Sequence, residues 1–220
     1  MFLNGKSITN YGASLVRNYT VSGMDVATEV EQGYNRTSYT LASQQLELKS
    51  LKVDIVFLGK NTRDLFEKKS LFDASCLGMV ELYMPDGFYY TAYLKTAGTL
   101  KIKADTMGEA SYQFKGIQHD PLIKAEKSTF FAYGTAPKMD ARIIVTASAD
   151  SDAYTVGSGV FSGINAGDVI VFDGINKLIT INGNHAAGQC TFLNFPQVVP
   201  GMNTIECPDV PTVEYYPVWV

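Results

Sequence analysis

The side chains best suited to chemistry in this 220-residue chain are its two histidines. His119 lies where a predicted strand ends, and His185 lies in a loop that contains two glycines. A catalytic histidine needs a nucleophile and an orienting acid, and the chain contains no G-x-S-x-G elbow to supply the nucleophile. The sequence therefore predicts no catalytic residue and no enzyme.

Neither the cysteines nor the acidic residues have the spacing of a metal site. The three cysteines are Cys76, Cys190 and Cys207. Without a C-x-x-C pair they are expected to be free thiols, although a bridge between Cys190 and Cys207 remains an alternative. Asp150-Ser-Asp152 begins like a calcium loop, but Thr155 and Phe161 stand where an EF-hand needs glycine and glutamate. We expect no metal and no cofactor.

Charge is distributed unequally along the chain. Residues 1–124 contain 14 Lys and Arg against 13 Asp and Glu, whereas residues 125–220 contain 4 against 9. Neither part concentrates the positive charge that a phosphate backbone requires, so no sequence-specific nucleic-acid binding is expected. No apolar run approaches the roughly 20 residues that span a bilayer, and Met1–Ile8 lacks the pattern of a signal peptide. We expect no membrane insertion, and folding in a cytosol.

The first domain is predicted to span residues 1–124 and to be mainly β with one helix. That helix is expected near residues 62–77, because Asn61 or Thr62 can cap its start and Gly78 can end it. The strand pattern before it shows a phase slip at Lys49-Ser50, which is typical of a β-bulge or a bend.

Two stretches of this domain offer side chains for contact with another protein. A hairpin over residues 79–94 turns at Pro85-Asp-Gly87, and Tyr83, Tyr89 and Tyr93 lie on the face that its own core does not need. Residues 22–39 suit either a helix turn or an extended arm, which carries Val26, Val30, Tyr34 and Tyr39. Exposed tyrosines can stack on sugars, but Tyr is also enriched at protein contacts. We predict that these seven residues form an oligomer interface.

The second domain is predicted to span residues 132–220, after a polar linker at 125–131. Short apolar strands alternate there with turn signals, as in a β-sandwich or jelly roll. At Pro200-Gly201 the proline presets φ and the glycine accepts a positive φ, which predicts a type II turn.

The order of these parts resembles the distal tail proteins of siphophages or prophages. In the second half the resemblance is carried by Tyr133-Gly-Thr-Ala-Pro137, Gly167-Asp-Val-Ile-Val-Phe-Asp-Gly174, Leu178-Ile-Thr-Ile-Asn-Gly183, the corner Phe195–Ile205 and Val213-Glu-Tyr-Tyr216. In the first half it is carried by the early strands, the arm, the helix, the Pro85-Asp-Gly87 hairpin and the exit at His119-Asp-Pro121. The closing Tyr216-Pro-Val-Trp219 departs from the family, whose members often carry arginines there.

The resemblance implies an N-terminal ring domain, a β-sandwich or split barrel, followed by a C-terminal galectin-like jelly-roll sandwich. It implies a structural component of the virion tail, assembled in the host cytoplasm: a homohexameric ring with a central channel for DNA. Its partners would be the tail tube protein and the baseplate hub or tail-associated protein. One alternative is a carbohydrate-binding module that contacts the host surface through the C-terminal sandwich, with Tyr154 or Trp219 as stacking residues. The other is a tail-associated hydrolase.

Overall fold

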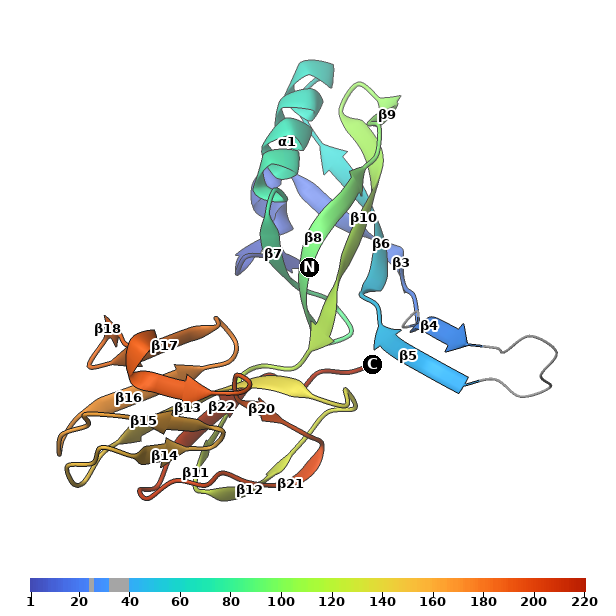
Figure 1. Cartoon of the computed structure of the whole chain (residues 1–220). Helices are drawn as coiled ribbons and strands as arrows, with labels where there is room; N and C mark the ends of the chain where they lie inside the picture. Colours follow the sequence, from blue (N-terminus) through green and yellow to red (C-terminus); the bar gives the residue numbers. More distant parts are fainter. Residues whose placement is uncertain (24–25, 32–39) are drawn as a thin grey trace. The chain divides into compact units, whose positions relative to one another are not determined.

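The computed structural model describes residues 1–23, 26–31 and 40–220 (Figure 1). The chain divides into two compact units, residues Met1–His119 together with Val220, and residues Asp120–Trp219. Both units consist mainly of strands, and the described residues form one α-helix, α1 (Thr62–Ser75). The predicted fold class, mainly β with a single helix, is confirmed.

An antiparallel eight-stranded sheet forms the body of the first unit. Its strands are β1 (Phe2–Leu3), β2 (Lys6–Ser7), β3 (Ala13–Val21), β6 (Lys49–Leu58), β7 (Met79–Tyr83), β8 (Tyr89–Ala97), β9 (Lys101–Ala104) and β10 (Met107–His119). They are ordered β2-β1-β7-β8-β10-β6-β3, with β9 beside β10. A short 3-10 helix, η1 (Ile8–Tyr11), leads into β3.

Helix α1 packs against one face of this sheet (Figure 1). Alternate residues of β6 are buried on that face; they are Leu51, Val53, Ile55 and Phe57. The side chain of Asn61 caps the helix by accepting the backbone N–H of Asp64 at 3.0 Å. Phe72 is fully buried, with its ring centroid 5.1 Å from that of Tyr112. The opposite face of the sheet is not covered by the helix.

The helix is shorter and its apolar stripe is narrower than the sequence predicts. It ends at Ser75, before the expected limit at residue 77. Phe66 and Leu77, which the pattern places beside the stripe, expose 54% and 73% of their surface. Leu65, Phe72 and Cys76 make the contact with the sheet instead.

Lys49 and Ser50, where the sequence predicts a bulge or a bend, pair regularly with β10 inside β6, and the chain instead passes from one sheet to another at Glu47-Leu48. β5 (Thr40–Leu46) ends before the slip and pairs with β4 (Val26–Glu31) in a two-stranded sheet of its own. The described part of the stretch at 22–39 is therefore an extended strand. Tyr34 and Tyr39 fall outside the described residues.

The second unit contains a seven-stranded sheet and two smaller ones. The large sheet consists of β11 (Ile123–Glu126), β13 (Met139–Thr146), β16 (Val169–Asp173), β17 (Leu178–Ile181), β18 (Asn184–His185), β20 (Gln197–Val198) and β22 (Thr212–Tyr215). The smaller sheets are β14 (Tyr154–Val156), β15 (Gly159–Phe161) and β19 (Cys190–Phe192), and β12 (Thr129–Ala132) with β21 (Gly201–Thr204). A 3-10 helix, η2 (Ala187–Gln189), precedes β19. Their apolar side chains share one core.

The chain divides between the two units earlier than the charge pattern suggests. The predicted linker at 125–131 includes the end of β11 and the start of β12, and both strands pair within the second unit. Lys124 lies opposite Glu214 of β22 in the ladder. The second unit begins before the change in charge balance near residue 124. Its first strand, β11, starts at Ile123 and already pairs with the distant β22.

Four residues of alternating charge lie side by side across β11, β22, β13 and β16. In this charge ladder the order is Lys124, Glu214, Arg142 and Asp173. The Lys124 ammonium lies 2.6 Å from Glu214, and Arg142 Nε donates to the same carboxylate at 2.7 Å. Glu214 is 1% exposed. Burial alone would raise the pKa of Glu214, but the hydrogen bonds from Lys124 and Arg142 outweigh it and hold that pKa below its ordinary value.

The chain bends at Pro200, and Gly201 has the positive φ that the predicted turn requires. Gly201 has φ of +103°, a conformation that side chains with a Cβ rarely adopt. Asn203 supports the turn, since its side chain accepts the Val199 N–H at 3.0 Å and donates to the Val199 carbonyl at 2.7 Å.

We expect Gly201→Val to destabilise the second unit by about 1–3 kcal/mol through backbone strain alone, because no atom lies within 4 Å of the added Cβ. Hydrogen exchange should become faster in the strands after Lys138 and stay unchanged before His119. Gly188→Val is the matched control, since its Cβ also meets open space and its φ is not positive. Equal loosening of both units by Gly201→Val would contradict the expectation.

Candidate assembly surfaces

The two histidines belong to different units. His119 is 4% exposed, its Nε2 lies 2.9 Å from the Thr91 hydroxyl, and its ring stacks on Tyr89 at 6.0 Å. His185 is exposed on β18. Among the described residues, no group of three or more His, Cys, Asp or Glu side chains is placed to hold a metal ion.

The cysteines are free thiols in environments that disfavour the thiolate. Burial raises the pKa of Cys76 to about 12 and that of Cys190 to about 11. The pKa of Cys207 is also raised, mainly by burial. Cys190 and Cys207 are not bridged. A thiol nucleophile needs the opposite shift, so none of the three is prepared for covalent chemistry.

The β4–β5 hairpin presents one apolar face, which we call the hairpin face. Cross-strand partners lie on the same side of an antiparallel pair, and the register pairs Val26 with Leu46 and Val30 with Leu41. Each of the four side chains is between 44% and 51% exposed. The other side of the hairpin is polar, with Glu29 accepting a hydrogen bond from Ser43 at 3.2 Å. A lone two-stranded hairpin is marginally stable in water, so a covering partner would stabilise it.

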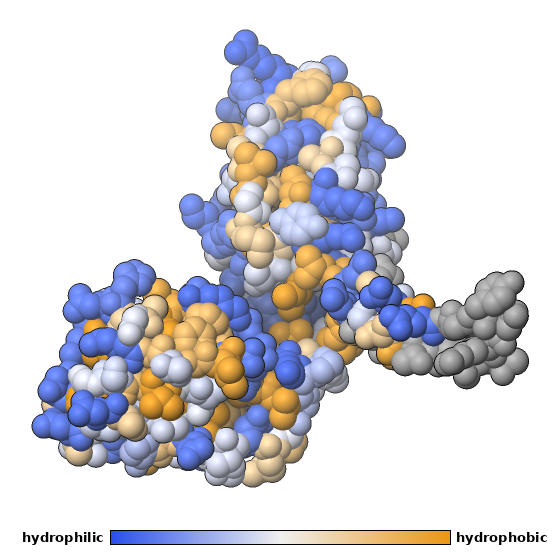
Figure 2. All heavy atoms as spheres, in the orientation of Figure 1, coloured by the Kyte–Doolittle hydropathy of each residue, from blue (hydrophilic) through white to orange (hydrophobic). Residues whose placement is uncertain are grey.

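The β7–β8 hairpin presents a second apolar surface, the tyrosine face. Val80, Leu82, Tyr90 and Ala92 point into the core. Tyr83, Tyr89 and Tyr93 therefore lie on the opposite side, where Tyr83 and Tyr93 are 36% and 39% exposed. The rings of Tyr83 and Tyr89 are 4.8 Å apart, and Phe2 of β1 extends the row at 6.1 Å from Tyr83. Figure 2 shows hydrophobic side chains, in orange, on the visible surface of both units.

The crystal structure of SPP1 Dit (gp 19.1), a paradigm of the hub adsorption apparatus in phages that infect Gram-positive bacteria, aligns with a TM-score of 0.78 at 12% identity. The alignment covers 100% of this chain and 98% of that one. The chain has the fold of a phage distal tail protein.

Two baseplate structures of phage P2 share the distal tail fold less closely. They show the activated conformation with Ca and with Sr, and they align with TM-scores of 0.54 and 0.53 at 10% identity. The alignments cover 96% and 95% of this chain, and 92% and 91% of those chains. No protein-family model matches the sequence, and neither does any curated protein.

The aromatic residues predicted for sugar stacking are unsuited to it in this distal tail fold. Tyr154 is 3% exposed, and its hydroxyl donates to Asp209 at 2.7 Å. Trp219 is partly buried and donates its indole N–H to Asp120 at 2.8 Å. Phe131 and Tyr133 are the exposed aromatic pair of this unit instead, with ring centroids 5.2 Å apart.

The residues predicted from the sequence include Val26 and Val30 of the hairpin face. They also include the three tyrosines of the tyrosine face. Leu41 and Leu46 of β5 are not among the predicted residues. The exposed side chain of Phe2 is not among them either, although an aromatic residue at the start of a two-residue edge strand is a recognisable signal. In the part of the chain that the structure describes, no helix is long and apolar enough to cross a membrane.

Proposed function

We propose that this protein is a structural component of a phage tail, a hexameric ring at the distal end of the tail tube. The ring would join the tube protein to the baseplate or tail-tip hub and leave a central channel for DNA. The observation that carries the proposal is the alignment with SPP1 Dit, which spans both units and nearly the full length of each chain. In this proposal the protein works by assembly in the virion tail, after synthesis in the host cytoplasm, and not by catalysis.

The predicted N-terminal domain, residues 1–124, is proposed to form the ring through the first unit that it contains. A ring needs two different surfaces that meet head to tail, and this unit supplies the hairpin face and the tyrosine face. Val26 and Val30 would contact the neighbouring copy's Tyr83, Tyr89 and Tyr93. Tyr34 and Tyr39 are proposed to belong to the same interface, from outside the described residues.

The predicted galectin-like domain, residues 132–220, is proposed to make up most of the second unit and to lie outside the ring. Residues 125–220 carry 4 basic against 9 acidic residues. Like charge on the second units of six copies disfavours their association with one another. Contacts between copies are therefore assigned to the first unit, while the second is available for the baseplate hub.

The mass of the purified full chain at micromolar concentration tests the proposal. Multi-angle light scattering should give six times the 24.1 kDa of one chain. Single chains or dimers over the whole micromolar range would contradict the hexamer. Assembly into six copies by the second unit alone would still support the hexamer. It would contradict the assignment of the interface to the first unit.

A further inference from the structure

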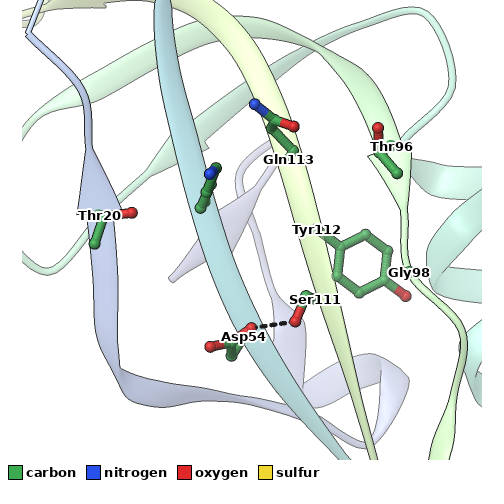
Figure 3. A pocket seen from close by; sticks show the side chains of 8 residues that line it. Thr20, Asp54, Thr96, Gly98, Ser111, Tyr112 and Gln113 are labelled. Atoms are coloured by element: carbon green, nitrogen blue, oxygen red, sulfur yellow. Dashed lines mark hydrogen bonds between the residues drawn. The ribbon is translucent and has the colours of Figure 1, made fainter.

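A polar groove crosses the uncovered face of the first unit's sheet (Figure 3). It has a volume of about 460 Å³. Four of its side chains form one cross-strand row, in the order Thr20, Lys52, Gln113 and Thr96 on β3, β6, β10 and β8. Neighbouring strands are roughly 4.8 Å apart, so the row presents closely spaced hydrogen-bonding groups from four strands.

A second pair lies beside this row. Asp54 follows Lys52 by two residues on β6, so both side chains leave the same face of the sheet, and Ser111 of β10 is its cross-strand partner. The Ser111 hydroxyl donates to the Asp54 carboxylate, as Figure 3 shows. Among the described residues that line the groove, Lys52 is the cation, Asp54 is the anion, and the others are uncharged.

The groove lies on the same side of the sheet as the tyrosine face. On β10, Gln113 and Lys115 point to one side, and the register pairs them with Thr96 and Tyr93 of β8. One face of the sheet thus carries the tyrosine face at β1, β7 and the start of β8, and the groove with its polar row across the middle of β3, β6 and β10. If the tyrosine face is buried against a neighbouring copy, the groove lies next to that interface and stays exposed to solvent.

We propose, as an extension of the ring proposed above, that this groove faces the DNA in the channel and that Asp54 offsets the charge of Lys52. The two residues are roughly 7 Å apart along β6, which is within a Debye length of about 8 Å at physiological salt. A passing phosphate therefore meets a nearly neutral pair. The hydroxyl groups and the amide of the row can hydrogen-bond to water or phosphate. Because they are uncharged, they do not attract DNA over a long range.

The ring makes this balance important because it multiplies any net charge by six. Six uncompensated lysines would release counterions from the duplex and bind it in a salt-dependent manner. A wall that retains DNA would oppose passage. Asp54 is accordingly assigned as the residue that keeps the groove from retaining DNA, and Ser111 as the residue that positions its carboxylate.

Anisotropy of a short fluorescein-labelled linear duplex, titrated with full-length rings, tests the assignment. Asp54→Asn keeps the size of the side chain and its ability to accept from Ser111, but it leaves Lys52 uncompensated. We expect it to bind the duplex at least about tenfold more tightly than the unaltered chain at 50 mM salt, and to lose this gain by 200 mM. Adding Lys52→Gln to the same chain should abolish the gain.

Glu67→Gln is the matched control, because it makes the same charge change on the exposed side of α1, where Glu67 pairs with Arg63 at 2.9 Å. We expect no gain from it. Equal gains from both variants, or no gain from Asp54→Asn in rings of confirmed six-copy mass, would overturn the assignment and leave the ring intact. Failure of the unaltered chain to form rings would instead overturn the proposed function itself.

Discussion

A chain carrying Val30→Asp should behave as single chains at a concentration where the unaltered chain forms six-copy rings. Val30 is 48% exposed in the single chain and pairs with Leu41 on the hairpin face. In the proposed ring this face is buried against the neighbour's tyrosine face. A carboxylate in such an apolar contact costs about 2 kcal/mol or more, roughly thirtyfold in affinity, at each of six interfaces. Light scattering across a dilution series measures the loss.

The opposite side of the hairpin supplies the control. Ala27→Asp introduces the same charge on the polar face, where the register pairs residue 27 with Gln45. We expect rings of normal mass from this variant. If Ala27→Asp breaks the rings as readily as Val30→Asp, or if neither does, the hairpin face is not the interface.

Glu214→Ala should lower the free energy of unfolding of the second unit by about 1–3 kcal/mol, the usual range for losing hydrogen bonds to a charged group. Removing this carboxylate leaves Lys124 and Arg142 without the acid at the centre of the charge ladder, in a part of the sheet where Glu214 itself is 1% exposed. Thermal unfolding measures the loss of stability. Hydrogen exchange should then show faster exchange in the second unit and unchanged exchange in the first. Glu126→Ala shortens an exposed acid on the neighbouring β11 and should change stability by less than about 0.5 kcal/mol. Similar effects from the two variants would contradict the importance of the ladder.

The same residue gives the second unit a defined response to acid. Because the folded pKa of Glu214 lies below its ordinary value of 4.5, the carboxylate contributes stability above pH 4.5, and this contribution is lost as pH falls through the folded pKa. Glu214→Gln removes this group from the titration. Its unfolding free energy should therefore fall less steeply than that of the unaltered chain below pH 4.5. Parallel curves would show that Glu214 does not contribute.

Elements specified by neighbouring residues are predictable from the sequence. The helix starts where Asn61 can cap it, and the Pro85-Asp-Gly87 turn separates two strands whose alternation already tells which tyrosines avoid the core. The positive φ of Gly201 follows from its place after a proline. In each case the signal lies within a few residues of the structure that it determines.

Features that depend on pairing between distant residues are not predictable in this way. A phase slip interrupts the apolar alternation near the start of β6, but a slip of this kind fits a bulge as well as a change of sheet, so it does not reveal that β5 and β6 belong to different sheets. β11 is short and polar, and it is recognisable as a strand only through its pairing with β22. The polar groove is hidden for the same reason, because its row joins residues 20, 52, 96 and 113 through the register of four strands.

Negative-stain electron microscopy of the purified full chain tests the central claim most directly. The account predicts rings with six-fold symmetry and a central hole, built from a chain whose first unit carries both apolar faces. Class averages without a hole, or particles no larger than one or two chains at concentrations where the protein is fully folded, would contradict it.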